Sequence, residues 1–270
     1  MKKFLKGKEI QLPNGKTVLE KPSFVPLIVL IVFLFTLLAM RVTKFNFTTL
    51  ITRGNEFFVI LKAMFPPNFE FIGRVWQPLF DTIKMSLLGS LVGALVSVPL
   101  ALLASANIIK NRFISGFFKL FLSILRTLPT IVTALIATFV FGLGTMAGTL
   151  AIFLFTVAYV GKLTYEQIES LDMSTFEALE SMGFTRFQAF RYAVIPEIMP
   201  TFLSTSLFNF EGNLRYASIL GYVGAGGLGI ILNERLGWRE YNNVGMILVV
   251  LIVTVAMIEL LSEYCRKKLQ

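Results

Sequence analysis

Three ionisable side chains interrupt long apolar stretches of this sequence and are its clearest candidates for chemistry. Arg126 stands in an apolar run over residues 113–161, and Glu211 and Arg215 stand four positions apart in a run that begins at Thr201. A charge at the depth of a bilayer is costly unless it faces a partner or an aqueous path. Two guanidinium groups can give paired hydrogen bonds to the oxygens of an anion, so these positions predict an anion pathway.

Neutral donors near Arg215 extend this hypothesis. Asn213, Ser218 and Tyr222 follow Glu211 closely in the sequence and could add hydrogen bonds to the same anion. One or two arginines partly offset by Glu211 would suit a pathway, because an anion held by many desolvated charges would not leave. An alternative stays open, since Glu211 and Arg215 share a helix face and can form an intrahelical ion pair.

Missing residue types exclude most catalytic chemistry. The 270 residues include no His and a single Cys. Imidazole bases, His-dependent nucleophiles, His-ligated metals and an intrachain disulfide are therefore not available. The phosphate-binding pattern Gly-x-x-x-x-Gly-Lys-Ser/Thr is also absent. We predict a protein that is not an enzyme and needs no metal or cofactor.

Glycines support packing and turns in our interpretation. Residues 224–229 fit Gly-x-Gly-x-x-Gly, but no strand precedes them as a dinucleotide site requires. We therefore interpret this stretch as a broken helix end or a close contact between helices. Gly89 and Gly93 form a Gly-x-x-x-Gly pair, which permits close approach of two helices.

Composition indicates several membrane spans. Hydrophobic residues make up 55% of the chain and charged residues 15%, against about 25% charged in soluble domains. The net charge of +9 comes from Lys and Arg near the ends of apolar stretches. That distribution is typical of membrane topology, and it does not predict a nucleic-acid partner.

Uncharged runs predict an all-α protein with six transmembrane helices. We expect these helices at residues 24–40, 85–106, 114–141, 145–163, 201–224 and 241–258, with Pro129 as a kink and a glycine-rich turn at 142–148. The predicted organisation is a leader at 1–22, a first helix at 23–40, an extracytoplasmic loop with an amphipathic helix at 41–80, a core at 81–264 and a tail at 265–270. A cleaved signal peptide is the alternative for the first helix, although residues 38–41 lack a small-x-small cleavage site.

The positive-inside rule sets the orientation. Lys and Arg are most frequent in the leader, the 107–113 turn, the loop before Pro200 and the tail. We therefore place both termini and this loop in the cytoplasm of a multi-pass membrane protein. Lys119 lies close enough to the same side to snorkel.

The polar loop at 164–200 predicts two short helices joined at Gly183. Ser174 with Glu177 has capping-box spacing for the first helix. Thr185 can cap a second helix, which we expect to stop before Pro196. Such a pair would be exposed beside the membrane, although a polar loop between any two spans can contain one.

This loop resembles the EAA signature of binding-protein-dependent ABC importer permeases, in which Glu-Ala-Ala is followed by Gly and then by Ile-x-Leu-Pro. The residues that match at the family spacing are Glu177, Ala178, Gly183 and Pro196. Leu179, Ala193 and Ile195 depart from the pattern but are still small or apolar. The resemblance implies a MetI-like permease fold. It also implies that residues 177–183 form the coupling helix that docks on a separate ATPase.

Two further segments resemble the phosphonate (PhnE-type) branch of these permeases, namely residues 126–129 and the glycine-rich stretch 213–229. The resemblance implies a subunit that forms a homodimer or a paired heterodimer, works with a cytoplasmic ATPase dimer and an extracytoplasmic binding protein, and imports a phosphonate-like anion. Arg126 and Arg215 would then line a pathway at the dimer axis. Methionine-type and betaine-type permeases share a similar glycine-rich ending and remain an alternative.

Two other classes of membrane protein remain as rivals. A stand-alone secondary transporter would show inverted repeats, and the sequence has no convincing repeat. A membrane-embedded lipid-phosphate transferase would need His or a group of intramembrane carboxylates. Copurification of an ATPase would discriminate against both rivals.

Overall fold

The computed structural model describes residues 9–11, 17–19 and 24–269, and it divides into a unit of residues 1–61 and a unit of residues 62–270. In the first unit, β1 (Glu9–Gln11) pairs antiparallel with β2 (Thr17–Leu19). The sequence prediction of a plain basic leader misses this pair, because three-residue strands are too short to show an alternating pattern.

Helix α1 (Val25–Val42) is apolar on every side. Its mean hydropathy is 2.6 and none of its residues is buried. A helix with no polar face is suited to contact with lipid. Pro26 lies in the first turn, where its missing N–H removes no helical hydrogen bond. Helix α2 (Phe47–Ala63) follows in the segment for which we predict an amphipathic helix.

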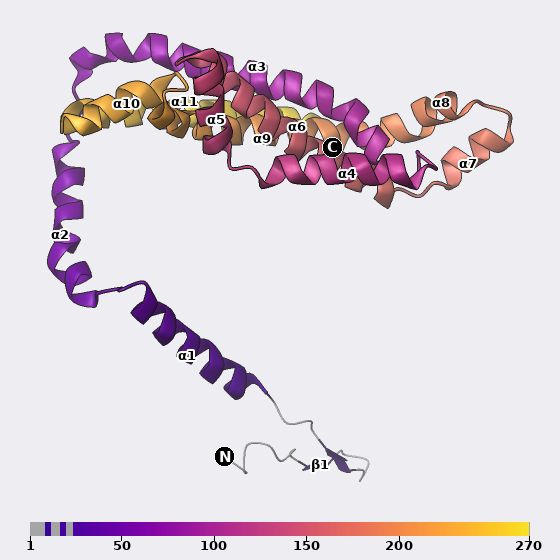
Figure 1. Ribbon diagram of the computed structural model, residues 1–270, viewed down its shortest axis with the longest axis horizontal. Helices are drawn as coiled ribbons and strands as arrows, with labels where there is room; N and C mark the ends of the chain where they lie inside the picture. Colours follow the sequence, from indigo (N-terminus) through magenta and orange to yellow (C-terminus); the bar gives the residue numbers. More distant parts are fainter. Residues whose placement is uncertain (1–8, 12–16, 20–23, 270) are drawn as a thin grey trace. The chain divides into compact units, whose positions relative to one another are not determined.

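The second unit is a helical bundle, and Figure 1 shows α7 and α8 at one end, α10 at the other and α5 running across the long helices. Its helices are α3 (Ile72–Ala104) after the 3-10 turn Phe69–Phe71, α4 (Arg112–Thr127), α5 (Thr130–Phe141), α6 (Thr145–Ser170), α7 (Ser174–Ser181), α8 (Arg186–Ala189), α9 (Ile195–Leu220), α10 (Leu228–Gly237) and α11 (Tyr241–Leu269). Within the described residues, four helices could each span a membrane, or up to six if each of two bent helix pairs is one span.

Helix α6 lies at the centre of the bundle and contacts α3, α4, α5 and α9. Gly89 and Gly93 of α3 face it closely, as the Gly-x-x-x-Gly spacing predicts. A Cβ atom on Gly93 would lie 2.7 Å from the Thr156 Cβ, and one on Gly89 would lie 2.7 Å from the Ile152 Cγ2. Only glycine therefore allows these backbones to approach so closely.

The third predicted span is two helices. α4 and α5 meet at 88° across Leu128 and Pro129. The proline ring disfavours a helical conformation in the residue before it, and Leu128 is extended with ψ 119°. We expected a kink within one continuous helix, and the structure has instead a sharp break between two helices. The predicted glycine turn after α5 is confirmed, with φ 84° at Gly142 and 139° at Gly144.

The loop helices agree with the prediction only in part. Gly183 follows α7 with φ 92°, and Thr185 forms a capping box with Gln188. Ser174 is not the cap, because α7 begins there with Met173 as the N-cap residue. The expected stop before Pro196 is also wrong. α8 continues through the π-helix Phe190–Val194 into α9, and Pro196 lies in the first turn of α9.

The glycine-rich stretch after α9 is a helix break, as predicted. α9 ends at Leu220, the 3-10 turn Gly221–Val223 follows, and Gly224 is left-handed with φ 77°. The chain then enters α10 at a 52° bend. Gly221 and Gly229 lie against each other, and a Cβ on either would clash with the backbone of the other.

Candidate functional site

The charges of α9 pair with α11 and not with each other. The Glu211 Oε1 lies 3.1 Å from an Arg266 Nη1, although the N–H is not aligned for a hydrogen bond. The Arg215 Nη2 lies 3.5 Å from a Glu259 Oε2. The intrahelical pair that the sequence leaves open is therefore not formed. Sequence spacing could not find these partners, because they lie on a different helix.

The two pairs differ in burial. The Glu211 side chain is 3% exposed, so its charge depends on Arg266 for compensation. Arg215 and Glu259 have side chains 55% and 54% exposed, so this pair lies at the surface of the chain. Arg215 is therefore the accessible cation of this part of α9, and Glu211 is a buried structural charge.

Asn213 belongs to a polar layer between helices. Its Nδ2 donates to the Ser90 Oγ at 2.8 Å and to the Thr156 Oγ1 at 2.9 Å, and Asn209 also donates to Thr156. Asn213 is 1% exposed. The structure thus places it as a bond between α9, α3 and α6, and not at an open surface as the pathway hypothesis expects.

Ser218 and Tyr222 differ in their surroundings. The Ser218 hydroxyl donates to the carbonyl of Arg215 at 2.6 Å and its side chain is largely buried. Its donor is therefore used within the helix. Tyr222 lies in the 3-10 turn after α9 and is 51% exposed, so its hydroxyl is accessible.

A cavity of about 410 Å³ lies beside Arg215. Arg215 and Asn209 supply its polar groups, and its other walls are mainly aromatic and apolar: Phe155, Tyr159, Phe208, Gly212, Tyr216 and Ile219. The Arg126 guanidinium carbon lies 5.9 Å from the centre of the Tyr159 ring. Arg215 thus lines this cavity directly, and Arg126 reaches its wall through Tyr159.

A second cavity, of about 430 Å³, shares Tyr159 and Phe208 with the first and also includes Arg266 and Lys267. The two cavities are neighbours, and we call the cations around them, Arg126, Arg215, Arg266 and Lys267, the cationic strip. Glu263 also lines the second cavity and pairs with Lys267 at 2.8 Å. Sequence reasoning missed the aromatic residues, because Phe and Tyr are expected throughout a membrane protein. It interpreted Arg266 and Lys267 only as topology signals.

The EAA residues lie on the exposed face of α7 and its flanks. Glu177, Ala178, Gly183 and Pro196 are all exposed. On the opposite face, the buried Phe176 packs in a cluster with Ile168, Ala189, Phe190, Val194 and Ile198. This cluster attaches the loop helices to the ends of α6 and α9. The loop is therefore anchored on one side and free to contact a partner on the other.

Exposed apolar residues continue this free face. Met182, Phe184, Phe187 and Tyr192 are between 40% and 74% exposed. An ion pair of 3.0 Å joins Glu180 to Arg186 and holds the short helices together across Gly183.

At the start of α7, hydrogen bonds from Ser174 hold the pKa of Asp172 below its usual range.

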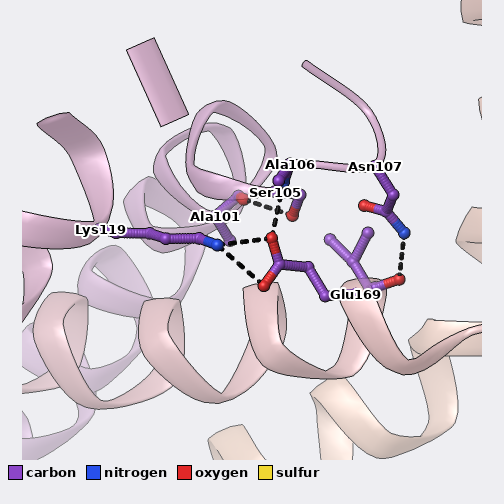
Figure 2. A network of polar contacts seen from close by, with 7 residues as sticks. Ala101, Ser105, Ala106, Asn107, Lys119 and Glu169 are labelled. Atoms are coloured by element: carbon purple, nitrogen blue, oxygen red, sulfur yellow. Dashed lines mark hydrogen bonds and ion pairs between the residues drawn. The ribbon is translucent and has the colours of Figure 1, made fainter. Parts of the chain in front are cut away.

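Lys119 joins a polar network at the α7 end of the bundle (Figure 2). Its Nζ lies 2.7 Å from the Glu169 Oε1 and 3.0 Å from the Oε2. The same carboxylate accepts the N–H of Ala106 at 2.7 Å. Glu169 therefore binds both α4 and the turn between α3 and α4 to the end of α6.

A polar cap lies at the opposite end, between α10 and α11. The Arg235 Nη1 lies 2.8 Å from a Glu240 Oε2, which also accepts from the side chain of Asn243. The hydrogen bonds from Arg235 and then Asn243 hold the pKa of Glu240 below its usual range. The Arg235 guanidinium also lies over the rings of Trp238 and Phe71.

No group of three or more His, Cys, Asp or Glu side chains that could hold a metal is found among the described residues. The arrangement offers accessible cations beside an aromatic cavity and an exposed loop face. It is suited to passage of an anion and to contact with a partner.

Comparison with known proteins agrees with this picture. Residues 97–264 match the family described as binding-protein-dependent transport system inner membrane component. The chain is 32% identical over 220 residues to the phosphite transport system permease protein PtxC of Stutzerimonas stutzeri, covering 82% of this chain and 80% of that protein. It is 29% identical over 185 residues to the glycine betaine/carnitine/choline transport system permease protein OpuCD of Bacillus subtilis, covering 68% of this chain and 78% of that one.

Solved structures of this fold are also similar. A chain of the inward-facing MetNI methionine ABC transporter superposes with a TM-score of 0.67 at 20% identity, covering 75% of this chain and 99% of that chain. A bacterial alginate ABC transporter in complex with an alginate-bound periplasmic protein gives a TM-score of 0.61 at 14% identity, covering 87% and 94%. At these identities the likeness establishes the fold alone.

Proposed function

We propose a function from the premise that this chain belongs to the family of binding-protein-dependent transport system inner membrane components. It is a multi-pass inner-membrane permease subunit of an ABC importer, and its cargo is phosphite, a phosphonate or a related phosphorus oxyanion. The relatives PtxC and the phosphate-import permease PhnE of Mycolicibacterium smegmatis, 29% identical over 82% of this chain and 41% of that one, carry names of this substrate class.

The observation that carries the substrate class is Arg215 beside the 410 Å³ cavity. A guanidinium group matches the oxygens of a phosphorus oxyanion in geometry and charge. Glu259 is the counter-ion of Arg215 at 3.5 Å and half-exposed, so an incoming anion can compete with it. Arg126 supplies a second positive charge on the far side of Tyr159.

Coupling to ATP is assigned to the exposed face of α7. Glu177, Ala178 and Gly183 would contact a cytoplasmic ATPase dimer, which would hydrolyse the ATP, so this chain is not itself an enzyme. The exposed Phe187, 74% accessible, supports this docking role because an apolar side chain gains from burial at an interface. Both termini would then lie in the cytoplasm, as the distribution of Lys and Arg supports.

Two further partners complete the importer. A second permease copy would bring two cationic strips together, so that the cavity wall formed by Tyr159 and Tyr216 faces its symmetry mate. An extracytoplasmic binding protein would deliver the anion and supply most of the selectivity. The likeness to the alginate transporter, whose structure includes a periplasmic protein, supports such an arrangement.

A quaternary ammonium cargo is the competing candidate. The rings of Phe155, Tyr159 and Tyr216 could provide cation–π contacts, and the relative OpuCD is named for betaine, carnitine and choline. Arg126 and Arg215 argue against it, since both place positive charge at the same aromatic cavity. We therefore place phosphorus oxyanions first.

The test is ATPase activity and uptake in proteoliposomes that contain the permease, its ATPase and its binding protein. We expect stimulation by phosphite or a phosphonate and none by methionine or glycine betaine. Arg215→Gln should lower uptake at least about tenfold, which corresponds to about 1.4 kcal/mol. Arg112→Gln is the matched control, because it removes an exposed charge at the start of α4, far along the helix from Arg126. Stimulation by betaine alone would overturn the substrate assignment.

A further inference from the structure

Glu169 connects three segments at the α7 end of the bundle. It pairs with Lys119 of α4 at 2.7 Å and accepts the N–H of Ala106 at 2.7 Å. Asn107, in the same turn, donates to the carbonyl of Ile168 at 2.7 Å. Figure 2 shows these contacts converging on the last turns of α6. The end of α6 is therefore bound to α4 and to the α3–α4 turn by polar contacts.

The same end of α6 is also the base of the loop helices. Ile168 is fully buried and belongs to the cluster that includes Phe176 of α7. α7 begins only a few residues after α6 ends. A displacement of α7 therefore acts on the end of α6 through Ile168, as well as on α8 and the start of α9.

One face of α4 lies along α6 from Lys119 to Arg126. Lys119 lies over the Tyr165 ring at 5.5 Å, and Arg126 lies near the Tyr159 ring at 5.9 Å. Between them Leu122 is fully buried, and a Cβ on Gly161 would lie 3.2 Å from its Cδ2. Seven residues of helix span about 10 Å, so this face joins the Glu169 network to the cationic strip.

These contacts differ in how well they resist sliding. Cation–π contacts give way most easily, since a ring offers the cation no single partner atom. The buried Leu122 against Gly161 resists a shift, because close-packed side chains interlock. The Lys119–Glu169 pair adds a charged contact in which the ammonium approaches both carboxylate oxygens. The pair therefore adds to the packing that sets the register of α4 on α6 at this end.

We propose that Glu169, with Lys119, is a positioning pair that makes α4 move together with α6 when the ATPase displaces α7, so that Arg126 is repositioned in each transport cycle. This inference rests on the proposed function for its ATPase partner. The pair is partly exposed, at 34% and 27%, so its contribution to folding should be small. Its loss should then change the coupling of motion more than it changes stability.

The first experiment measures movement without any transported substrate. Spin labels are placed at Phe117→Cys on α4 and Ser170→Cys at the end of α6, both exposed positions, in a Cys265→Ser background. The full complex is compared without nucleotide and trapped with ATP and vanadate. We expect the label distance to stay constant between states when the pair is intact and to change with nucleotide in Glu169→Gln, because α6 then moves without α4.

Matched variants separate positioning from simple damage. Glu169→Gln keeps an oxygen that can accept the Ala106 N–H and removes only the charge. Lys119→Arg should behave as the wild type, whereas Lys119→Gln should reproduce Glu169→Gln. Lys162→Gln is the control, since it breaks an exposed pair with Glu166 within the same helix. Its label distance should not change with nucleotide.

The second experiment measures phosphite taken up per ATP hydrolysed in proteoliposomes. We expect Glu169→Gln to lower this ratio by at least about fivefold, and Lys162→Gln to leave it unchanged. A wild type that ignores phosphorus oxyanions would overturn the substrate assignment but leave the label experiment valid. A constant label distance in Glu169→Gln, together with a normal transport ratio, would overturn the positioning role.

Discussion

The Glu211 carboxylate of α9 lies 3.1 Å from the Arg266 guanidinium near the end of α11, and only 3% of the Glu211 side chain is exposed. Arg266 is also a member of the cationic strip and lines its second cavity. The pair therefore joins α9 to α11 and fixes the position of Arg266 beside the second cavity. It also leaves Arg215 free to meet Glu259 or an anion.

We predict that removing one member of the Glu211–Arg266 pair destabilises the protein. Arg266→Gln leaves a buried carboxylate without compensation, which should cost about 3–5 kcal/mol. The check is the thermal unfolding midpoint of the purified protein in detergent. The double variant Glu211→Gln with Arg266→Gln should recover most of the loss, and a single variant as stable as the wild type would contradict the pairing.

We predict that Glu259→Gln strengthens the interaction of Arg215 with phosphorus oxyanions. Glu259 competes for the guanidinium at 3.5 Å, and both side chains are half-exposed. Because an exposed pair contributes at most about 1 kcal/mol, the concentration of phosphite needed for half-maximal ATPase stimulation should fall by up to about fivefold. An increase in that concentration would show that Glu259 assists the anion instead of competing with it.

We predict that Gly93→Ala destabilises the bundle and that Gly73→Ala does not. Both positions lie in α3, but a Cβ at 93 would stand 2.7 Å from the Thr156 Cβ while a Cβ at 73 would meet nothing within 4 Å. Overpacking of this kind costs about 1–3 kcal/mol. Unfolding midpoints of the two variants provide the comparison, and equal midpoints would refute the close α3–α6 contact.

We predict a pH-dependent contribution from Glu240. Its pKa is lowered from the ordinary 4.5 by hydrogen bonds from Arg235 and Asn243, so the folded state favours the charged form. The contribution is therefore complete above pH 4.5 and disappears as the pH falls through the lowered pKa. The difference in unfolding midpoint between wild type and Glu240→Gln should be largest near neutral pH and should vanish in acid. A difference that stays constant with pH would rule out this carboxylate.

Features that depend on neighbouring residues could be predicted from the sequence. The apolar runs, a bend at Pro129, the helix end at Gly183 and the Thr185 cap follow from local sterics and hydrogen bonding, which act within a few residues. The size of the bend at Pro129, 88°, did not. The two corrections in this loop, at Ser174 and Pro196, concern helix ends. Several neighbouring residues can serve as the terminal residue of a helix, so its position is hard to predict.

Contacts between distant segments were decided only by the tertiary structure. Glu211 could pair with Arg215 on its own helix, but the packing of α9 on α11 brought Arg266 and Glu259 close enough to take their places. The packing of α9 on α3 and α6 likewise places Asn213 in a buried polar layer with Ser90 and Thr156. The sequence by itself determined a multi-span permease with charges at membrane depth. Which charge is buried, which remains accessible and which helix holds it depended on helix packing, because ion pairs form between side chains that are close in space, whatever their separation along the chain.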